Sequence, residues 1–490
     1  MIGATLTRQN PHHQRRWLIL VILGIAQLMV VLDATIVNIA LPSAQKALHF
    51  SNNDRQWIVT AYSLAFGSML LLGGKISDLF GRKRALIIGL SGFAIVSAIG
   101  GAAQSFLMLA GARALQGLFG ALLAPAALSL LTTTFTDPSE RGKAFGVFGA
   151  IAGSGASIGL LLGGALTQLL DWRAVMYVNL LLAAIAVGGA LVLLRNEVPD
   201  EKPKLDLPGV VSVSAGLFAL VFGLAHAETT NWTNPMTLAA LAASVPLLAL
   251  FVWIERRAEH PLLPLRVLAD RDRGASYMSI GLAAVSMFGA FLFLTYYLQQ
   301  NLGYSPILTG VAFLPMTLTV MVSATLVNTK LAPRLGPRPL VALGMALGAG
   351  AMAYLTGLGV HSSYVTAVMP TLVAMGIGLG LVFAPAMNNG TLGVEPRDAG
   401  VASATVNTSQ QIGGAIGTAL LSTLATGATS NYLAGSVPTA AAVAHATVHG
   451  YTTAFAWSAA IFALGALLAA VLFRRGAPQP AEAAQPAFAH

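Results

Sequence analysis

The sequence predicts an all-α polytopic membrane protein with fourteen transmembrane helices, and three observations support that prediction. The 490 residues are 56% hydrophobic and 9% charged, and the mean hydropathy is +0.74, which is unlike the composition of soluble domains. Apolar runs of about 20 residues, the length that crosses roughly 30 Å of hydrocarbon, recur from Trp17 to Phe473. The basic residues are concentrated in alternate loops between these runs.

The first run follows two arginines and could be read as a secretory signal. It is too long for one, lacks a small-residue cleavage pattern and is followed by thirteen more runs, so we expect a retained helix. The fourteen expected spans, in residue numbers, are 17–41, 56–74, 85–104, 107–131, 142–170, 172–194, 208–227, 236–254, 274–299, 307–329, 339–359, 364–388, 399–427 and 451–473.

The charge of the loops predicts the orientation of the protein in the membrane. With both termini on the cytoplasmic side, 23 of the 27 basic residues fall in inner loops or tails, and only Lys46, Arg55 and Arg173 fall in outer loops. This positive-inside asymmetry accounts for the net charge of +9, and an odd number of helices would scramble it. We therefore expect a multi-pass protein of the cell (cytoplasmic) membrane, in contact with the lipid bilayer and without a nucleic-acid partner.

Two polar stretches, 195–208 and 255–273, bracket a pair of helices and leave six helices on either side. The expected organisation is a cytoplasmic N-terminal tail (1–16), an N-terminal six-helix bundle (17–195), a linker with two extra transmembrane helices (196–273), a C-terminal six-helix bundle (274–473) and a cytoplasmic tail (474–490).

An internal repeat supports this division. KISDLFGRKRALIIG at 75 is similar to KLAPRLGPRPLVALG at 330, GALLAPAALSL at 120 to GLVFAPAMNNG at 380, and DPSERG at 137 to EPRDAG at 395. The three pairs occur in the same order and at nearly one offset, which is hard to obtain by chance. Duplicated six-helix halves with a site at their interface are typical of transporters.

Asp33 is the only one of the 18 carboxylates that falls at membrane depth, and Arg113 is the only base there. A mid-helix carboxylate costs roughly 2.5–3.5 kcal/mol on insertion scales, so it indicates a cavity, a partner or a function. Desolvation favours the protonated form and a nearby arginine the ionised form, as a proton-coupling residue requires. The alternatives are a structural ion pair or snorkelling for Asp33, and bonds to backbone carbonyls of the first helix for Arg113.

Three motifs now support a family resemblance. LDATIVNIALP (32–42), GGKISDLFGRKR (73–84) and RALQGLFGA (113–121) are similar to the helix 1, loop 2-3 and helix 4 motifs of the major facilitator superfamily, specifically its fourteen-helix drug:proton antiporter branch of multidrug efflux proteins. The resemblance covers residues 17–473. It implies the major facilitator fold, in which two six-helix bundles are related by a pseudo-two-fold axis and two extra helices lie between them.

The resemblance also implies a gating loop formed by Gly74, Asp78, Gly81 and Arg82. Asp78 lies where the second span leaves the membrane, where a carboxylate can pair with a base or meet the positive N-terminus of a helix from the other half. Such a contact would exist only when the inner gate is shut. Topogenic charge alone would explain the basic residues of this loop but not Asp78.

Small residues predict tight packing of the fourth and fifth spans. Gln116, Gly117 and Gly120 share a helical face with Arg113, and Gly159, Gly163 and Gly164 belong to the fifth span. The family's antiporter motif there usually has a proline where this sequence has Leu160, so we expect a straighter helix. The sixth span also departs from the family pattern, although Asn179 is kept.

The other polar and aromatic residues at membrane depth suit varied lipophilic guests, neutral or monocationic because no second carboxylate is present. Taken singly, each is more typical of interhelical hydrogen bonding or packing. The candidate substrate-binding residues are Gln27, Asn38, Tyr62, Phe288, Phe291, Tyr296, Met387, Asn388, Asn407, Gln410 and Gln411.

Other classes of protein find little support. The nine histidines lie in tails, loops or near helix ends and there is no cysteine, so we expect no metal site, no cofactor and no catalytic residues. The sequence has no nucleotide-binding loop, so a proton gradient is the expected energy source. We expect a monomeric, non-enzymatic exporter of drugs, antibiotics or dyes that works by alternating access. The alternative is a uniporter or symporter for a small metabolite or nutrient.

Overall fold

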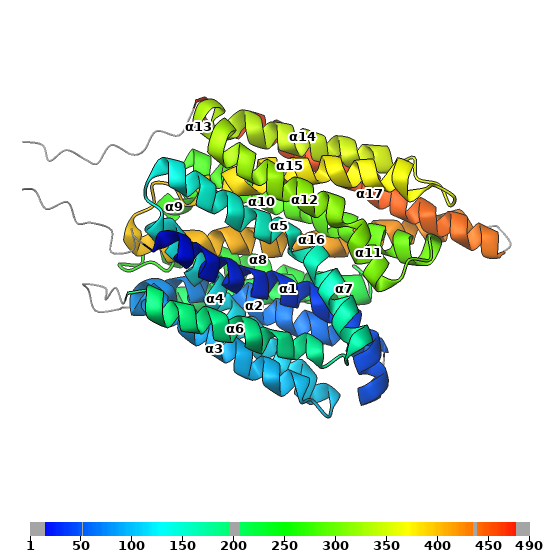
Figure 1. The fold of residues 1–490 in the computed structure, drawn as a ribbon, viewed down its shortest axis with the longest axis horizontal. Helices are drawn as coiled ribbons and strands as arrows, with labels where there is room; N and C mark the ends of the chain where they lie inside the picture. The colour runs from blue at the N-terminus through cyan, green and yellow to red at the C-terminus, as the bar shows by residue number, and fades with distance from the viewer. Residues whose placement is uncertain (1–14, 51, 196–205, 435–438, 477–490) are drawn as a thin grey trace, which may run out of the picture.

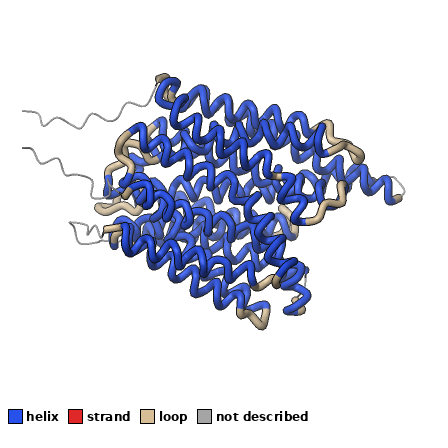
Figure 2. Tube along the Cα trace, viewed as in Figure 1, coloured by secondary structure: helices blue, strands red, loops and turns tan. Residues whose placement is uncertain are grey.

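The computed structural model describes residues 15–50, 52–195, 206–434 and 439–476, and its long elements are all α-helices (Figures 1 and 2). These residues include no strand. Thirteen helices in the described part are long and apolar enough to cross a membrane, and α5 adds another long helix, of 32 residues. The all-α membrane fold is confirmed, and the number of long helices agrees with the fourteen expected spans.

The helices follow one another in sequence with short connections. The first six are α1 (Arg16–Leu48), α2 (Asn52–Phe80), α3 (Arg82–Gly101), α4 (Phe106–Thr134), α5 (Pro138–Leu169) and α6 (Ala174–Leu193). The extra pair is α7 (Leu207–Thr229) and α8 (Pro235–Glu255), followed by the short α9 (Leu265–Ala269). The last group is α10 (Arg271–Tyr296), α11 (Pro306–Ala312), α12 (Leu314–Leu326), α13 (Ala332–Leu335), α14 (Pro337–Leu355), α15 (Met369–Gly390), α16 (Ala399–Leu433) and α17 (Ala440–Leu472).

Short irregular turns interrupt the last group. Three are π-helical turns, in which the backbone carries one extra residue per turn, and one is a 3₁₀ turn. They are η1 (Tyr297–Asn301), η2 (Val327–Leu331), η3 (Tyr364–Val368) and η4 (Pro396–Asp398).

The internal repeat is visible in the backbone. Gly81 and Gly336 align in the repeat, and both adopt a positive φ, 96° and 75°, which glycine reaches without steric cost. Each of them ends one helix and begins the next, α3 or α14. The aligned prolines Pro125 and Pro385 both lie inside a helix, α4 or α15. The repeated sequence therefore specifies repeated turns and repeated helix interiors.

The helices pack in two groups that meet along a few of their members. In the first group α2 and α3 pack on α4, and α1 packs on α5 and α6; in the second, α14 packs on α15 and α17, and α10 on α16 (Figure 1). Contacts between the groups run from α5 to α12 and α15, and from α2 to α16. The extra helices α7 and α8 pack on each other, and α7 also contacts α2 and α16.

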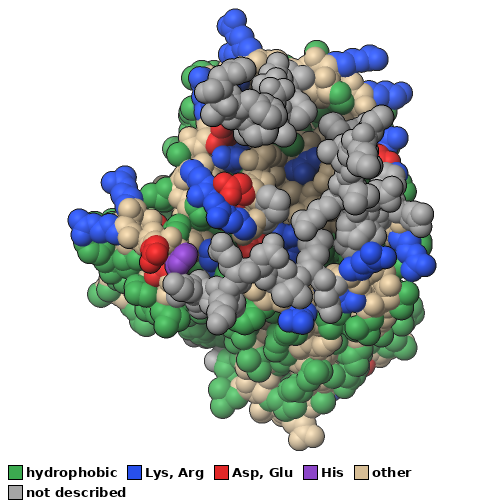
Figure 3. All heavy atoms as spheres, turned by 90° about the vertical axis from the view of Figure 1, so that its left-hand side faces the viewer, with side chains coloured by type: hydrophobic (Ala, Val, Ile, Leu, Met, Phe, Trp, Pro, Cys, Tyr) green, Lys and Arg blue, Asp and Glu red, His purple; other side chains and the backbone are tan. Residues whose placement is uncertain are grey.

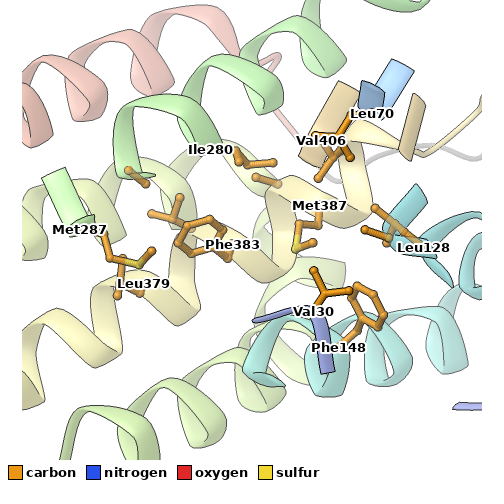
Figure 4. Packing of buried hydrophobic residues seen from close by; sticks show 14 of the residues in the cluster. Val30, Leu70, Leu128, Phe148, Ile280, Met287, Leu379, Phe383, Met387 and Val406 are labelled. Atoms are coloured by element: carbon orange, nitrogen blue, oxygen red, sulfur yellow. The ribbon is translucent and has the colours of Figure 1, made fainter. Parts of the chain in front are cut away.

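A buried apolar cluster lies where the two groups meet. Its members come from α1, α2, α5, α15 and α16, and Figure 4 shows them together. We call Val30, Leu70, Phe148, Met387 and Val406 the interface cluster; each is at most 6% exposed. Burial of such side chains excludes water from the region between the groups.

One end of the molecule is rich in basic side chains. Figure 3 shows Lys and Arg around its rim, with apolar side chains covering the flanks beyond it. The first residues of α1 and the last residues of α17 lie at this end (Figure 1). The flanks expose large apolar residues such as Val192 and Leu467, at 73% and 66%, as lipid-facing helices do.

The helix boundaries differ from expectation mainly at the outer ends. α1 continues past Pro42 to Leu48, and α17 begins at Ala440, well before the expected residue 451. The segment AAAVAHA that opens α17 is rich in alanine, the strongest helix former. Thr439 caps it by accepting a hydrogen bond from the Ala442 N–H at 3.2 Å. These two expected spans are therefore shorter than α1 and α17.

Candidate functional site

Asp33 lies on α1 with 0% of its side chain exposed, and it pairs with Arg113 of α4. The Arg113 Nη1 group donates to Asp33 Oδ2 at 2.5 Å, and the arginine is only 1% exposed. A buried ion pair is stable only where further hydrogen bonds satisfy both partners. The structure thus brings together the only acid and the only base that the sequence places at membrane depth.

Amide groups from two helices complete the surroundings of Asp33. Its second oxygen, Oδ1, accepts hydrogen bonds from Asn179 Nδ2 of α6 at 2.9 Å and from Gln116 Nε2 of α4 at 3.2 Å. Both amides also donate to Ser97 Oγ of α3, Gln116 at 2.7 Å and Asn179 at 3.3 Å. Helices α1, α4 and α6 therefore meet at one carboxylate, and α3 joins them through Ser97. We call Asp33, Ser97, Arg113, Gln116 and Asn179 the carboxylate network.

Arg113 has partners beyond Asp33. Its Nε donates to the Ile58 carbonyl of α2 at 3.4 Å, and its Nη1 donates to Gln116 Oε1 at 2.8 Å. Its guanidinium carbon lies 4.4 Å from the centre of the Tyr62 ring, a cation–π distance. The alternative in which Arg113 bonds carbonyls of the first helix is not what the structure has: the carbonyl belongs to α2.

Two glycines bring α4 against α2 beside Arg113. A methyl group on Gly117 would lie 2.4 Å from the Tyr62 carbonyl oxygen, and one on Gly120 would lie 3.0 Å from the Phe66 ring. Gly159 and Gly163 of α5 face α1, whereas Gly164 faces Ile307 of α11. These glycines lie at helix contacts, whereas Gln116 belongs to the carboxylate network and is more than a packing residue.

Asp78 joins the two helix groups at the basic end. Its two oxygens accept hydrogen bonds from the backbone N–H groups of Gly400, at 2.9 Å, and Val401, at 3.2 Å. These groups belong to the first turn of α16, whose positive end favours an anion. Arg82 lies 3.4 Å from the same carboxylate. A methyl on Gly74 would lie 2.6 Å from the Gly400 carbonyl oxygen, so α2 and α16 touch here.

Arg141 forms a second link between the groups, and it belongs to the repeated segment DPSERG. Its Nε donates to Asn388 Oδ1 at 2.7 Å, and its Nη2 donates to Thr391 Oγ1 at 2.9 Å. Arg141 lies in the first turn of α5 and is 8% exposed, while Asn388 lies near the end of α15. Asn388, a candidate for the substrate pocket, therefore has a structural partner at the basic end. The repeat includes Arg141 in a duplicated segment but does not indicate a role for it.

The segment between α8 and α10 lies across the same end. Lys75 of α2 donates to the Pro261 carbonyl at 2.9 Å, and Arg266 pairs with Asp398, just before α16, at 2.6 Å. The buried Glu255 holds the segment by accepting from the Leu263 N–H at 2.9 Å. The segment that follows the extra helices therefore contacts α2 at Lys75, three residues before Asp78. It also contacts Asp398, two residues before Gly400 of α16.

The remaining candidates for the pocket are scattered. Met387 belongs to the interface cluster, Phe291 stacks on Phe313 at 5.0 Å, and Tyr296 packs near Tyr451 of α17. Phe288 lies against Gly414, Asn407 donates to its own helix at Ser403, and Gln410 and Gln411 are partly buried. Gln27 and Tyr62 are buried, and their polar oxygens have no hydrogen-bond partner among the described residues. The side chains of Asn38 and Leu160 lie outside the described part of the protein.

The described residues contain no group of three His, Cys, Asp or Glu side chains placed to hold a metal ion. The polar groups that do converge are the carboxylate network and the contacts at the basic end. The first surrounds one buried carboxylate with hydrogen-bond donors, and the second links the two helix groups.

Comparisons with known proteins agree with this architecture. Residues 23–418 match the family described as Major Facilitator Superfamily. The protein is 49% identical over 466 residues to puromycin resistance protein pur8 of Streptomyces alboniger, covering 95% of this sequence and 92% of that one. It is 36% identical over 436 residues to cephamycin export protein CmcT of Amycolatopsis lactamdurans, covering 87% and 89%.

A solved structure has the same fold at low sequence identity. The crystal structure of the human organic anion transporter MFSD10 (TETRAN) matches with a TM-score of 0.63 and 16% identity, covering 93% of this protein and 99% of that one. At this identity the likeness supports the fold and no more. The family match over most of the sequence and the similarity to pur8 give the assignment: this multi-pass membrane protein belongs to the Major Facilitator Superfamily.

Proposed function

We propose that this protein is a proton-coupled exporter of lipophilic neutral or monocationic small molecules, with Asp33 as the protonation site. One observation carries the proposal: the Asp33 carboxylate is fully buried among membrane helices and paired with the buried Arg113, in a protein 49% identical to a puromycin resistance protein. A buried ionisable residue in a membrane helix is by default a functional residue. Export driven by a proton gradient needs one such group.

The geometry supplies a reason why a proton would change the conformation. Ionised Asp33 balances the charge of Arg113 and accepts hydrogen bonds from Gln116 and Asn179. Protonation removes that balance and leaves a buried cation without its counterion, which is strongly unfavourable. A state in which Arg113 reaches water or another partner then becomes the more stable one. A cationic substrate near Asp33 would favour loss of the proton and so drive the reverse change.

The contacts at the basic end supply the gate. Asp78 meets the first turn of α16, and Arg141 joins α5 to α15, while the interface cluster fills the space between the groups. We propose that the structure represents the state whose inner gate is shut, and that these contacts break when the inner side opens. Each six-helix bundle then moves as a unit, with boundaries near residues 195 and 274, while the helices of 196–273 support the gate.

The distribution of charge supports the proposed placement. The basic rim (Figure 3) lies at the end that holds Asp78 and Arg141, and the positive-inside rule assigns such an end to the cytoplasm. We propose that the protein lies in the cell membrane with both termini in the cytoplasm. We also propose that it acts as a monomer without enzymatic activity and that the proton gradient is its energy source.

Replacing Asp78 with asparagine is expected to open the inner gate more often. The variant loses the negative charge that accepts hydrogen bonds from two N–H groups. The lower end of the range for a hydrogen bond to a charged group is about 1.5 kcal/mol. A loss of that size raises the population of the open state about tenfold. Because the sequence has no cysteine, a Met387→Cys reporter in the interface cluster can be labelled cleanly. Everted vesicles expose the cytoplasmic side to an impermeant maleimide, and labelling should be about tenfold faster with Asp78→Asn.

The matched control is Asp171→Asn, because Asp171 lies at the opposite end with 58% of its side chain exposed. It should leave the labelling rate of the same reporter unchanged. Equal rates for Asp78→Asn and the parent would show that the contact with α16 does not hold the gate.

The function itself is tested with a substrate panel in a host that lacks its own efflux pumps. Puromycin comes first, followed by other lipophilic antibiotics and dyes, with the empty vector as control. We expect raised resistance and lower intracellular accumulation of at least one compound. A uniporter or symporter that imports would instead raise accumulation, and no change across the panel would contradict export of this class of compound.

A further inference from the structure

One atom of the carboxylate network has no partner among the described residues. Asn179 is 0% exposed, and its Nδ2 donates to both Asp33 Oδ1 and Ser97 Oγ. Its other amide atom, Oδ1, is buried and accepts no hydrogen bond from the described part of the protein. A buried polar atom left unsatisfied costs about 1–3 kcal/mol, so the arrangement calls for a reason.

Gln116 provides a comparison within the same network. Its Nε2 donates to Asp33 and Ser97, as Asn179 does, but its Oε1 accepts from Arg113 at 2.8 Å. Turning the Gln116 amide would place its NH₂ group against the guanidinium and break that bond. The Asn179 oxygen accepts no hydrogen bond from a described residue, so turning this amide breaks no bond to its oxygen. Of the two amides, only that of Asn179 can exchange its ends without losing a bond to its oxygen.

The turned amide fits protonated Asp33. If the Asn179 side chain rotates by half a turn, Oδ1 takes the place of Nδ2 and faces Asp33 Oδ1 and Ser97 Oγ. A carboxylic acid has a proton to donate to it, whereas a carboxylate has none. Ser97 also has a hydroxyl hydrogen to donate, because its oxygen is the acceptor in both bonds from the amides. The present orientation suits the ionised form, and the turned orientation suits the protonated form.

We propose that Asn179 is a positioning residue that turns its carboxamide with each protonation of Asp33, and so satisfies both forms of the proton-binding carboxylate. The proposal rests on the proposed function, in which Asp33 binds the transported proton. The charged and titratable groups that face Asp33 are Arg113 from α4 and Tyr62 from α2. The described residues facing it from α3 and α6, namely Ser97 and Asn179, do not titrate.

The role explains why a neutral amide stands at this position of α6. A fixed donor would stabilise only the ionised form and so oppose protonation. A fixed acceptor would oppose loss of the proton. An amide that can present either end provides one hydrogen bond to each form, so the carboxyl group keeps Asn179 as a partner before and after it takes up a proton.

The test is a pH-difference infrared spectrum of the purified full-length protein in lipid nanodiscs. Protonation of Asp33 gives a carboxyl C=O band, identified by its absence from Asp33→Asn. We expect an asparagine carboxamide C=O band to move to lower frequency over the same pH range, because that oxygen gains hydrogen bonds. Labelling with asparagine that carries ¹³C in its carboxamide group should shift this band. Asn179→Leu should lose it, and Asn407→Leu should keep it, because Asn407 bonds its own helix.

The outcomes separate the two proposals. A carboxyl band that titrates without any change in an asparagine band, or with a change that persists in Asn179→Leu, would overturn the amide switch and leave the proposed function intact. Absence of a titrating Asp33 band would overturn the proposed function itself. If Asn179→Leu does not fold, Asn179→Ser has a smaller side group without an amide and must lose the same band.

Discussion

Asp33→Asn is expected to abolish the uptake of substrate by everted vesicles when a pH gradient is imposed across them. Asparagine has nearly the shape of aspartate and cannot bind or release a proton in this range, so the substrate can no longer be coupled to the gradient. Asp33→Glu keeps the acid and should retain part of the uptake. The measurement is the initial rate of uptake of a substrate found in the panel, with the parent protein run in parallel.

The neutral substitution also leaves Arg113 without its counterion, which costs about 3–5 kcal/mol when a buried pair is broken. Folding must therefore be checked by size-exclusion chromatography and by substrate counterflow, which requires no gradient. A folded variant that retains counterflow and loses gradient-driven uptake supports the role of Asp33. Gradient-driven uptake at the parental rate would rule that role out.

Gly117→Ala is expected to lower the stability of the protein and its transport activity together. The new methyl would lie 2.4 Å from the Tyr62 carbonyl oxygen, and a backbone atom cannot move aside as the end of a flexible side group does. Overpacking of this kind typically costs about 1–3 kcal/mol. The shift of α2 would also displace the Tyr62 ring from Arg113. The apparent midpoint temperature of unfolding in detergent should therefore fall, and transport should fall with it.

The same helix provides a matched control. Gly111 lies on α4 as well, and a methyl group there would meet nothing within 4 Å. Gly111→Ala should therefore leave the midpoint unchanged or raise it, since alanine in a helix is favoured over glycine by roughly 0.5–1 kcal/mol. Equal midpoints for the two variants would contradict the close contact between α4 and α2.

The sequence predicts the fold class well because the bilayer imposes a simple rule on it. Long apolar runs, basic loops and a repeat that carries its turn glycines define the helices and their order. Asp33 and Arg113 are predicted to be partners for the same reason: charges at membrane depth are so costly that a single acid and a single base need each other. Gly81 and Asp78 follow from a specific motif.

Neutral polar residues are much harder to assign from sequence. Asn179 donates to Asp33, and Ser97 accepts from the amides of Gln116 and Asn179. Serine and asparagine in membrane helices are usually interhelical bonding groups. The family pattern includes Asn179 without indicating this contact, and nothing in the sequence marks Ser97. The sequence does not distinguish a pocket asparagine from a structural one, so Asn388 is a candidate for the pocket. In the structure it accepts a hydrogen bond from Arg141. Which helices face one another decides these roles, and that depends on tertiary packing.

The most direct test of coupling between protons and substrate measures both fluxes together. Purified protein is reconstituted in liposomes that contain a pH-sensitive dye, the membrane potential is clamped, and a gradient of substrate is imposed. We expect protons to move in the direction opposite to the substrate, and Asp33→Asn to show no such movement. Substrate flux without proton movement, or protons that move in the same direction as the substrate, would contradict this coupling.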